Sequence, residues 1–171
     1  MYRLIMALTF LISGPALAAT AKPAPVKVEH FDARSPASLI ALLGTMNAKA
    51  EITRQDADQI FLVISTSGGK FGAQMVNCDA SGATCQGLAL FSTFDLKGPN
   101  LAEINDFNRS QLACRGILTP EGKPSVMYST LLNGRMTRED MQTHIGVWQG
   151  CLASFGEFTR DPIAFLSKPH I

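Results

Sequence analysis

Cysteine is the residue type whose number and spacing most restrict the chemistry of this chain. The four cysteines are Cys78, Cys85, Cys114 and Cys151. The seven-residue step from Cys78 to Cys85 matches neither the C-x-x-C motif of redox proteins nor the ligand spacing of a zinc ribbon. An even number of cysteines in an oxidising compartment ordinarily forms disulfides, and four cysteines allow three connectivities.

Two of the cysteines flank a turn-rich loop, Asp79 to Thr84, between two strand-like runs. A hairpin at this loop would bring Cys78 and Cys85 within the short distance that a disulfide requires. By elimination Cys114 would pair with Cys151 and would join two helix-like segments. The alternative interpretation of the second pair is a thiol–disulfide redox protein that uses Cys114 and Cys151.

Histidines and carboxylates do not form a recognisable catalytic or metal site in the sequence. His144 lies two helical turns before Cys151, about 10 Å away, which is too far for both to bind one ion without other ligands. The adjacent acids fall in the first turns of predicted helices, where the helix dipole favours negative charge; they are Glu103 with Asp106 and Glu139 with Asp140. We therefore expect no catalytic residue, no metal ligand and no cofactor, and a protein that is not an enzyme.

Two further motifs have structural interpretations. Ser67-Gly68-Gly69-Lys70 contains part of a phosphate-loop pattern, but its glycines connect two strand-like runs and so predict a turn. Asn105 and Asn108 are poor helix formers within a predicted helix. If Phe107 between them faces the sheet, both amides are placed to bond backbone groups of the preceding loop or of a strand end.

The first 18 residues have the three parts of an export signal. Arg3 gives a positive head, Leu4 to Ile12 form an apolar run, and Ala16-Leu17-Ala18 is a small-x-small cleavage site. The apolar run is shorter than the roughly 20 residues of a membrane span, and no cysteine follows the site to carry a lipid. We expect cleavage after Ala18, no membrane span, and a periplasmic or secreted protein.

Charge and composition indicate a compact domain without affinity for nucleic acid. The chain has 171 residues, 46% of them hydrophobic, with 15 Lys and Arg against 14 Asp and Glu. Loss of Arg3 with the signal peptide would leave 14 cations against 14 acids, so no long-range field would attract phosphates. The length is that of one domain.

Hydrophobic periodicity predicts an α+β domain over residues 35–160, between a flexible leader rich in Ala, Pro and Lys (19–34) and a C-terminal tail (161–171). The expected order is helix, three strands, helix, two strands, helix, with the polar stretch Glu51 to Asp58 before the first strand. Thr137 is the expected N-cap of the last helix, whose apolar stripe includes Trp148. Because strands and helices do not alternate, we expect one antiparallel sheet of about five strands, a meander plus a hairpin, packed with three helices.

A set of motifs lies along residues 50 to 158: Asp56-Ala57-Asp58, the hairpin of Cys78 and Cys85, the strand Leu90 to Phe94, the helix Asn105 to Asn108, the turn at Glu121-Gly122 and the long last helix. In this set of motifs the chain resembles the YbjN family. The family usually has Trp where this chain has Phe107, and its Gly-Asp-Gly turn is Pro120-Glu121-Gly122 here. The expected structural residues of the family motif are Asn105, Phe107, Asn108 and Trp148.

The resemblance implies a fold and a class of function. Members of the YbjN family are described as bacterial sensory transduction regulators, and their domain is similar to type III secretion chaperones. This fold implies a surface that binds a segment of another protein, often in a homodimer, and no catalytic residues.

The apolar inventory of ten Phe and seven Met agrees with such a surface. We therefore expect an exported binding or regulatory module that takes a protein segment or an apolar ligand in a groove beside the sheet. Met75, Met127 or Met141 would line this groove; alternatively, these methionines belong to the core.

Overall fold

The computed structural model describes residues 30–168, so the predicted signal peptide, its cleavage site after Ala18 and most of the leader lie outside the described residues. Six strands form one sheet in the order β1-β2-β3-β4-β6-β5, and every neighbouring pair is antiparallel. The elements are α1 (Pro36–Thr45), β1 (Lys49–Gln55), β2 (Gln59–Thr66), β3 (Gly69–Val76), β4 (Gly87–Thr93), α2 (Leu101–Ser110), β5 (Arg115–Leu118), β6 (Pro124–Leu131), α3 (Arg138–Arg160) and α4 (Pro162–Leu166). No helix within residues 30–168 has the length and apolar character needed to cross a membrane.

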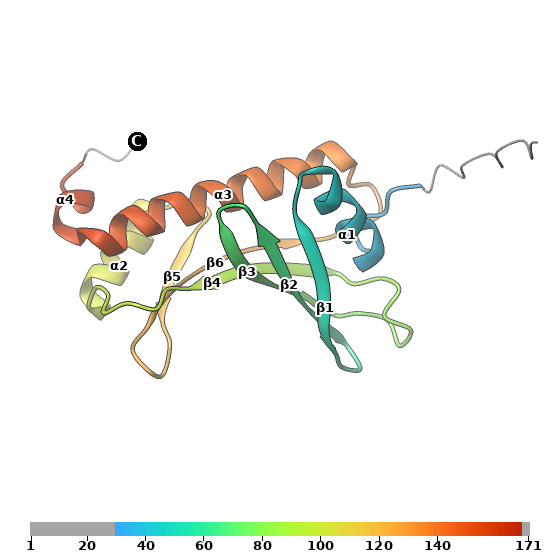
Figure 1. Ribbon diagram of the computed structural model, residues 1–171, viewed down its shortest axis with the longest axis horizontal. Helices are drawn as coiled ribbons and strands as arrows, with labels where there is room; N and C mark the ends of the chain where they lie inside the picture. Colours follow the sequence, from blue (N-terminus) through green and yellow to red (C-terminus); the bar gives the residue numbers. More distant parts are fainter. Residues whose placement is uncertain (1–29, 169–171) are drawn as a thin grey trace, which may run out of the picture.

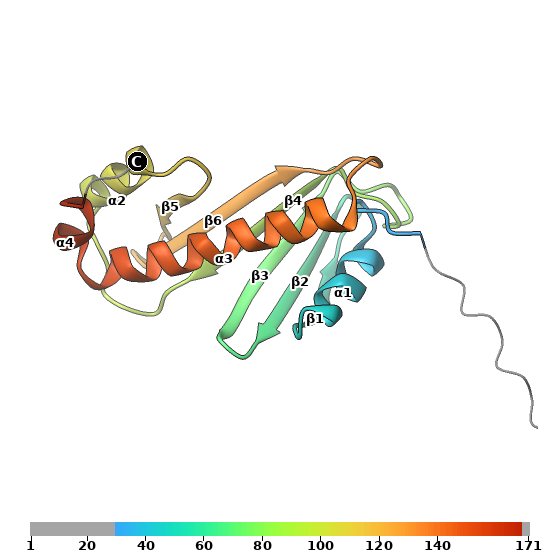
Figure 2. The same ribbon diagram turned by 90° about the horizontal axis from the view of Figure 1, so that it is seen from above.

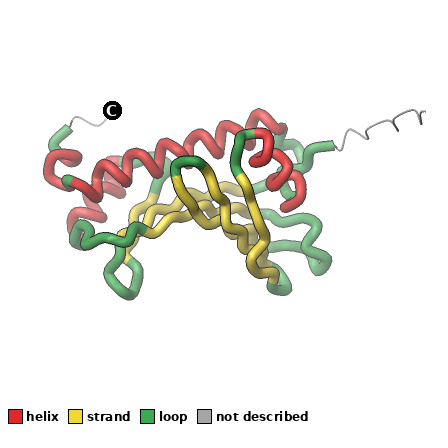
Figure 3. The backbone as a smooth tube through the Cα atoms, in the orientation of Figure 1, coloured by secondary structure: helices red, strands yellow, loops and turns green. Residues whose placement is uncertain are grey.

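The helices α1 and α3 lie on one face of the sheet, and none of the helices within residues 30–168 covers the opposite face (Figures 1 and 2). Side chains therefore alternate along the strands between a buried and an open side. In β2 the residues Ile60, Leu62 and Ile64 are buried under the helices, whereas Phe61 and Val63 point to the open side and remain partly exposed. The main core is the layer of buried side chains between the sheet and these two helices. Figure 3 shows this arrangement, with the strands in yellow below the helices in red.

The predicted class, an α+β domain with a single antiparallel sheet, is confirmed, but the described part of the chain has six strands rather than about five and four helices rather than three. The additional strand is β1. It lies at the sheet edge and exposes six of its seven residues, so it lacks the apolar alternation that identifies a strand in a sequence. The additional helix, α4, lies in the segment expected to be the C-terminal tail and buries Phe165.

An aromatic cluster joins α2, α3 and α4 at one end of the molecule. Phe107 of α2 is fully buried, with its ring centroid 4.8 Å from Phe158, 5.1 Å from Phe155 and 5.8 Å from Phe165. The strand β5 also approaches this cluster closely, since a Cβ at Gly116 would lie 2.8 Å from the ring of Phe155. Glycine at this position lets the strand and the rings pack together.

Capping boxes define the first residues of the helices α2 and α3. Asn100 and Glu103 form a capping box at the start of α2, and Thr137 and Asp140 form another at the start of α3, where the sequence predicted the N-cap. Each box supplies acceptors for backbone N–H groups that the helix itself leaves without partners.

Asn108 connects α2 to β5. Its side-chain amide accepts a hydrogen bond of 2.7 Å from the backbone N–H of Gly116 and donates one of 2.9 Å to the carbonyl of the same residue. Asn105, one turn earlier, is exposed and makes no side-chain hydrogen bond within the described residues. Of the two amides singled out in the sequence, Asn108 is therefore the one that bonds a strand backbone.

We expect Asn108→Ala to reduce the free energy of unfolding by about 1–3 kcal/mol, because it leaves the N–H of Gly116 without an acceptor in a largely buried place. Asn105→Ala is the matched control and should change stability by less than about 0.5 kcal/mol. Urea denaturation of both variants measures the difference. Equal losses would mean that the contact with Gly116 does not hold α2 to the sheet.

Candidate functional site

The structure contains two disulfides, and they pair the cysteines as the sequence predicted. Cys78 is bonded to Cys85 between β3 and β4, and Cys114, which precedes β5, is bonded to Cys151 on α3. Cys114 is 6% exposed and Cys151 is 1% exposed. Because thiol–disulfide exchange requires a thiolate to reach one of the sulfurs, this burial offers no support for the redox alternative.

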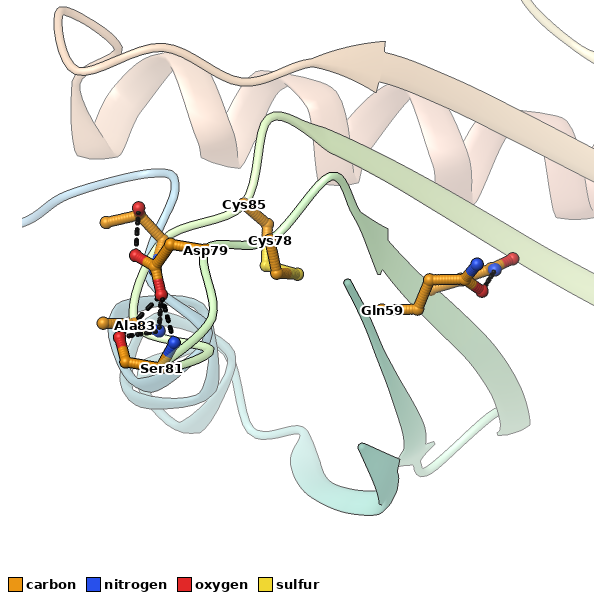
Figure 4. Close-up of a disulfide and its surroundings, with 8 residues drawn as sticks. Gln59, Cys78, Asp79, Ser81, Ala83 and Cys85 are labelled. Carbon is orange, nitrogen blue, oxygen red and sulfur yellow. Dashed lines mark hydrogen bonds between the residues drawn. A yellow bond between two sulfur atoms is a disulfide. The ribbon is translucent and has the colours of Figure 1, made fainter. Parts of the chain in front are cut away.

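The loop inside the first disulfide is organised by Asp79 (Figure 4). One carboxylate oxygen accepts hydrogen bonds from the backbone and hydroxyl of Ser81 and from the backbone of Ala83, and the other accepts from the backbone and hydroxyl of Thr84. Donation from the two hydroxyls, with support from the backbone N–H groups, holds the pKa of Asp79 well below its usual value. The carboxylate is thus fully engaged in shaping the loop.

The remaining residues singled out in the sequence do not form a catalytic cluster. The Nδ1 atom of His144 contacts the hydroxyl of Tyr128, and burial raises the pKa of this hydroxyl. Within the part of the chain that the structure describes, no group of three or more His, Cys, Asp or Glu side chains is placed to hold a metal ion.

The methionines expected to line a groove are mostly core residues. Met75 and Met141 are fully buried, which agrees with the alternative interpretation, and Met127 is partly exposed on the open face of the sheet. Trp148, an expected structural residue, is also fully buried; its ring lies 5.5 Å from that of Phe71, and its indole N–H has no partner among the described residues.

The most distinctive feature of the sheet is a fork between β3 and β4. Their pairing ends at Gly72 opposite Phe91, although β3 begins three residues earlier at Gly69 and β4 continues to Thr93. Beyond this point β3 stays paired with β2, and β4 stays paired with β6. The β2–β3 turn accordingly projects away from the line of β4 (Figure 2).

A cleft of about 700 Å³ lies at the fork on the helix side of the sheet. Its walls come from both separated strands, from α3 and from the residues after α1. Its lining is mixed: apolar side chains come from Met46, Phe71, Phe94, Leu152 and Ala153, and polar or charged ones from Asn47, Thr66, Ser67, Lys70, Ser92 and Gln149. The volume falls within the range of ordinary ligand sites.

A second hollow, of about 480 Å³, lies at the same fork on the open face. Phe61, Val63, Gly72 and Phe91 form its floor. Lys70 borders both hollows and, among the residues that the structure describes, is the one charged residue that lines them. The Ser67 to Lys70 segment thus forms the turn that the sequence predicted, but its position beside two hollows depends on the fork, for which the sequence carries no signal.

No protein-family model matches this chain, and no curated protein is significantly similar to it. The resemblance to the YbjN family therefore stays a prediction.

The pH dependence of stability tests the role of Asp79. Because its pKa is lower in the folded protein than the ordinary value of 3.8, the stability that this carboxylate contributes is fully present above about pH 4 and is lost as the pH falls below that value. We expect Asp79→Asn to lower the urea midpoint at neutral pH and to lose less stability than the wild type between about pH 4 and about pH 2.

Glu139→Gln serves as a control for this measurement, since it removes an exposed carboxylate far from the loop in sequence. Its pH profile should stay close to that of the wild type. An Asp79→Asn profile parallel to the wild type would show that the hydrogen bonds to Asp79 do not stabilise the folded state.

Proposed function

We propose that this protein is an exported, non-enzymatic binding module that takes an extended segment of another protein into the fork between β3 and β4. The observation that carries the proposal is the early end of β3–β4 pairing at Gly72 and Phe91, beside the 700 Å³ cleft. Residues 69–71 of β3 then have one paired side, toward β2, and one side free of strand partners within the described sheet.

Backbone geometry favours a peptide as the occupant. In a hairpin with a two-residue turn, the two residues that flank the turn, here Thr66 and Gly69, form backbone hydrogen bonds with each other. The backbone groups of Gly69 therefore point to β2, and the N–H and C=O of the next residue, Lys70, point away from β2 toward the fork. An extended segment gains hydrogen bonds by pairing with such an edge, as in other cases of strand addition. Its side chains alternate, so every second one would enter the cleft.

The opposite wall of the cleft favours apolar side chains of the segment. Leu152 and Ala153 of α3 face the cleft together with Phe71 and Phe94, and only Gln149 adds a polar group from α3. Burial of one large apolar side chain against these groups would contribute about 1.5–3 kcal/mol. The strand edge would fix the direction of the segment, and the apolar wall would select its side chains.

This function agrees with the resemblance to the YbjN family and to type III secretion chaperones. That resemblance implies a surface for a segment of another protein, a regulatory role and often a homodimer. The two disulfides fit an oxidising compartment outside the cytoplasm, as expected for an exported protein.

A random-peptide phage library selected on the wild-type protein tests the proposal. Trp148 is the one tryptophan of the chain and packs on Phe71 at the cleft wall, so its fluorescence reports binding there. We expect selected peptides to change this emission and to bind one per chain. Ala153→Arg, which places a long cation in the cleft, should weaken them at least about tenfold, a loss typical of a blocked contact.

Ala102→Arg is the matched control, because Ala102 is an exposed alanine on the helix α2 and does not line the cleft. It should leave peptide affinity unchanged. Peptides that bind both variants equally, or a selection that yields no peptide, would contradict the proposal. Apolar compounds that bind in the cleft where no peptide does would identify an apolar ligand as the occupant instead.

A further inference from the structure

The open face of the sheet carries an apolar row that crosses four strands. Val63 of β2 lies opposite Gly72 of β3, which lies opposite Phe91 of β4, which in turn lies opposite Met127 of β6. At a spacing of about 4.8 Å between strands, the row is about 14 Å long. The face that carries this row is concave, and the β1–β2 and β5–β6 turns project from the sheet on either side of it (Figure 1).

Glycine in the middle of the row makes its floor continuous. A Cβ at Gly72 would lie only 2.3 Å from the ring of Phe91, so this ring occupies the place of the missing side chain. Phe61 extends the floor on the next row, where the guanidinium of Arg54 lies 3.8 Å above its ring. The result is the 480 Å³ hollow, with a smooth aromatic and aliphatic base.

One cation beside the hollow, Lys70, forms no ion pair within residues 30–168. Lys49 is paired with Glu51 at 2.6 Å, and Arg54 with Asp56 at 3.1 Å. Arg115, at the far end of the row, donates to the carbonyl of Cys114 at 2.7 Å. Lys70 is exposed, lines the hollow, and forms no ion pair with any described residue.

We infer that this face binds a single-chain anionic amphiphile, a long-chain carboxylate, with its hydrocarbon chain along the row from Val63 to Met127 and its head group at Lys70. The site is separate from the proposed peptide cleft, because Lys70 directs its side chain to the open face whereas Phe71, the next residue, directs its ring to Trp148 on the helix side.

Backbone pairing decides between a hydrocarbon chain and a peptide on this face. The strands that carry the row are paired on both sides from Val63 to Met127, so the row offers no free N–H or C=O; the free groups of Lys70 lie beyond its edge, at the fork. A peptide laid on it would bury amide groups without partners, which costs free energy, whereas a hydrocarbon chain has no such groups.

The charge of the face argues against a second copy of the chain as the occupant. Among the strand residues of the open side, Lys49, Arg54, Lys70 and Arg115 stand against Glu51 alone, an excess of positive charge on the strands; the flanking turns add Asp56, Asp58, Asp95, Glu121 and Lys123. Two copies packed face to face would bring this excess together. The pKa of Glu51 is lowered by hydrogen bonding from Lys49 and, more weakly, by the charge of Lys70, so the charge of Lys70 reaches across this end of the face.

Calorimetric titration of the full mature protein with dodecanoate and with dodecanol tests the inference. We expect one dodecanoate per chain below its micellar concentration, bound about tenfold more tightly than the uncharged alcohol, as one added charge contact would give. Lys70→Gln should remove the preference for the carboxylate and retain binding of the chain. Val63→Glu should weaken the binding of dodecanoate at least about tenfold, because the added carboxylate on the floor of the hollow repels the anionic ligand.

Leu131→Glu is the matched control, since Leu131 is also an exposed apolar residue of the open face but does not line the hollow. It should bind like the wild type, and thermal unfolding checks that all variants fold. In nitrogen-edited NMR spectra, addition of dodecanoate should shift the backbone amide signals of Phe61, Gly72 and Phe91.

Four results would each overturn the inference. These are equal affinity for the acid and the alcohol, retention of the carboxylate preference in Lys70→Gln, shifts confined to α3, and binding only to phosphatidylglycerol vesicles with none to monomeric dodecanoate.

Discussion

The packing of α3 across one face of the sheet is the interaction on which the rest of the structure depends. Its 23 residues span about 35 Å, and the stripe that includes Trp148, Phe155 and Phe158 is almost fully removed from solvent. The disulfide from Cys151 to Cys114 ties the same helix to the strand β5. With α1 on the same side, the molecule becomes a two-layer domain in which all helical cover lies on one face.

Because the described helices cover one face of the sheet, the opposite face is open, and this open face is not fully polar. Antiparallel sheets commonly present a solvated face, but the open side here carries a continuous row of Val63, Gly72, Phe91 and Met127. The fork adds a second surface, because the β2–β3 turn leaves the line of β4 and lies beside α3. The two hollows therefore meet at Lys70 but differ in chemistry: the cleft lies along the free strand edge, and the row on the open face lies on strands that are paired on both sides.

The Cys78–Cys85 disulfide and the Asp79 loop join β3 to β4 at the end of the sheet opposite the fork. Cys78 and Cys85 close the β3–β4 connection just beyond the last paired residues, Val76 and Gly87. Asp79 accepts hydrogen bonds from the backbone of the closed loop, so this connection is cross-linked at one end while the strands separate at the other.

Sequence patterns determined the class of fold, the main helices and the Cys78–Cys85 pair, because each depends on neighbours in the chain; the Cys114–Cys151 pair, 37 residues apart, followed only by elimination. The capping residue Thr137, the apolar stripe of α3 and the turn at Ser67 to Lys70 are local signals of this kind. β1 was missed because its side chains are exposed at an edge, where pairing through the backbone alone makes a strand. Whether Met75, Met127 and Met141 line a groove or the core was decided only by the tertiary structure, as were the fork, both hollows and the unpaired state of Lys70. These features depend on which strands stop pairing and on which face the helices cover. Both are decided by contacts between residues far apart in the chain, and the spacing of neighbouring residues does not predict the free energy of such contacts.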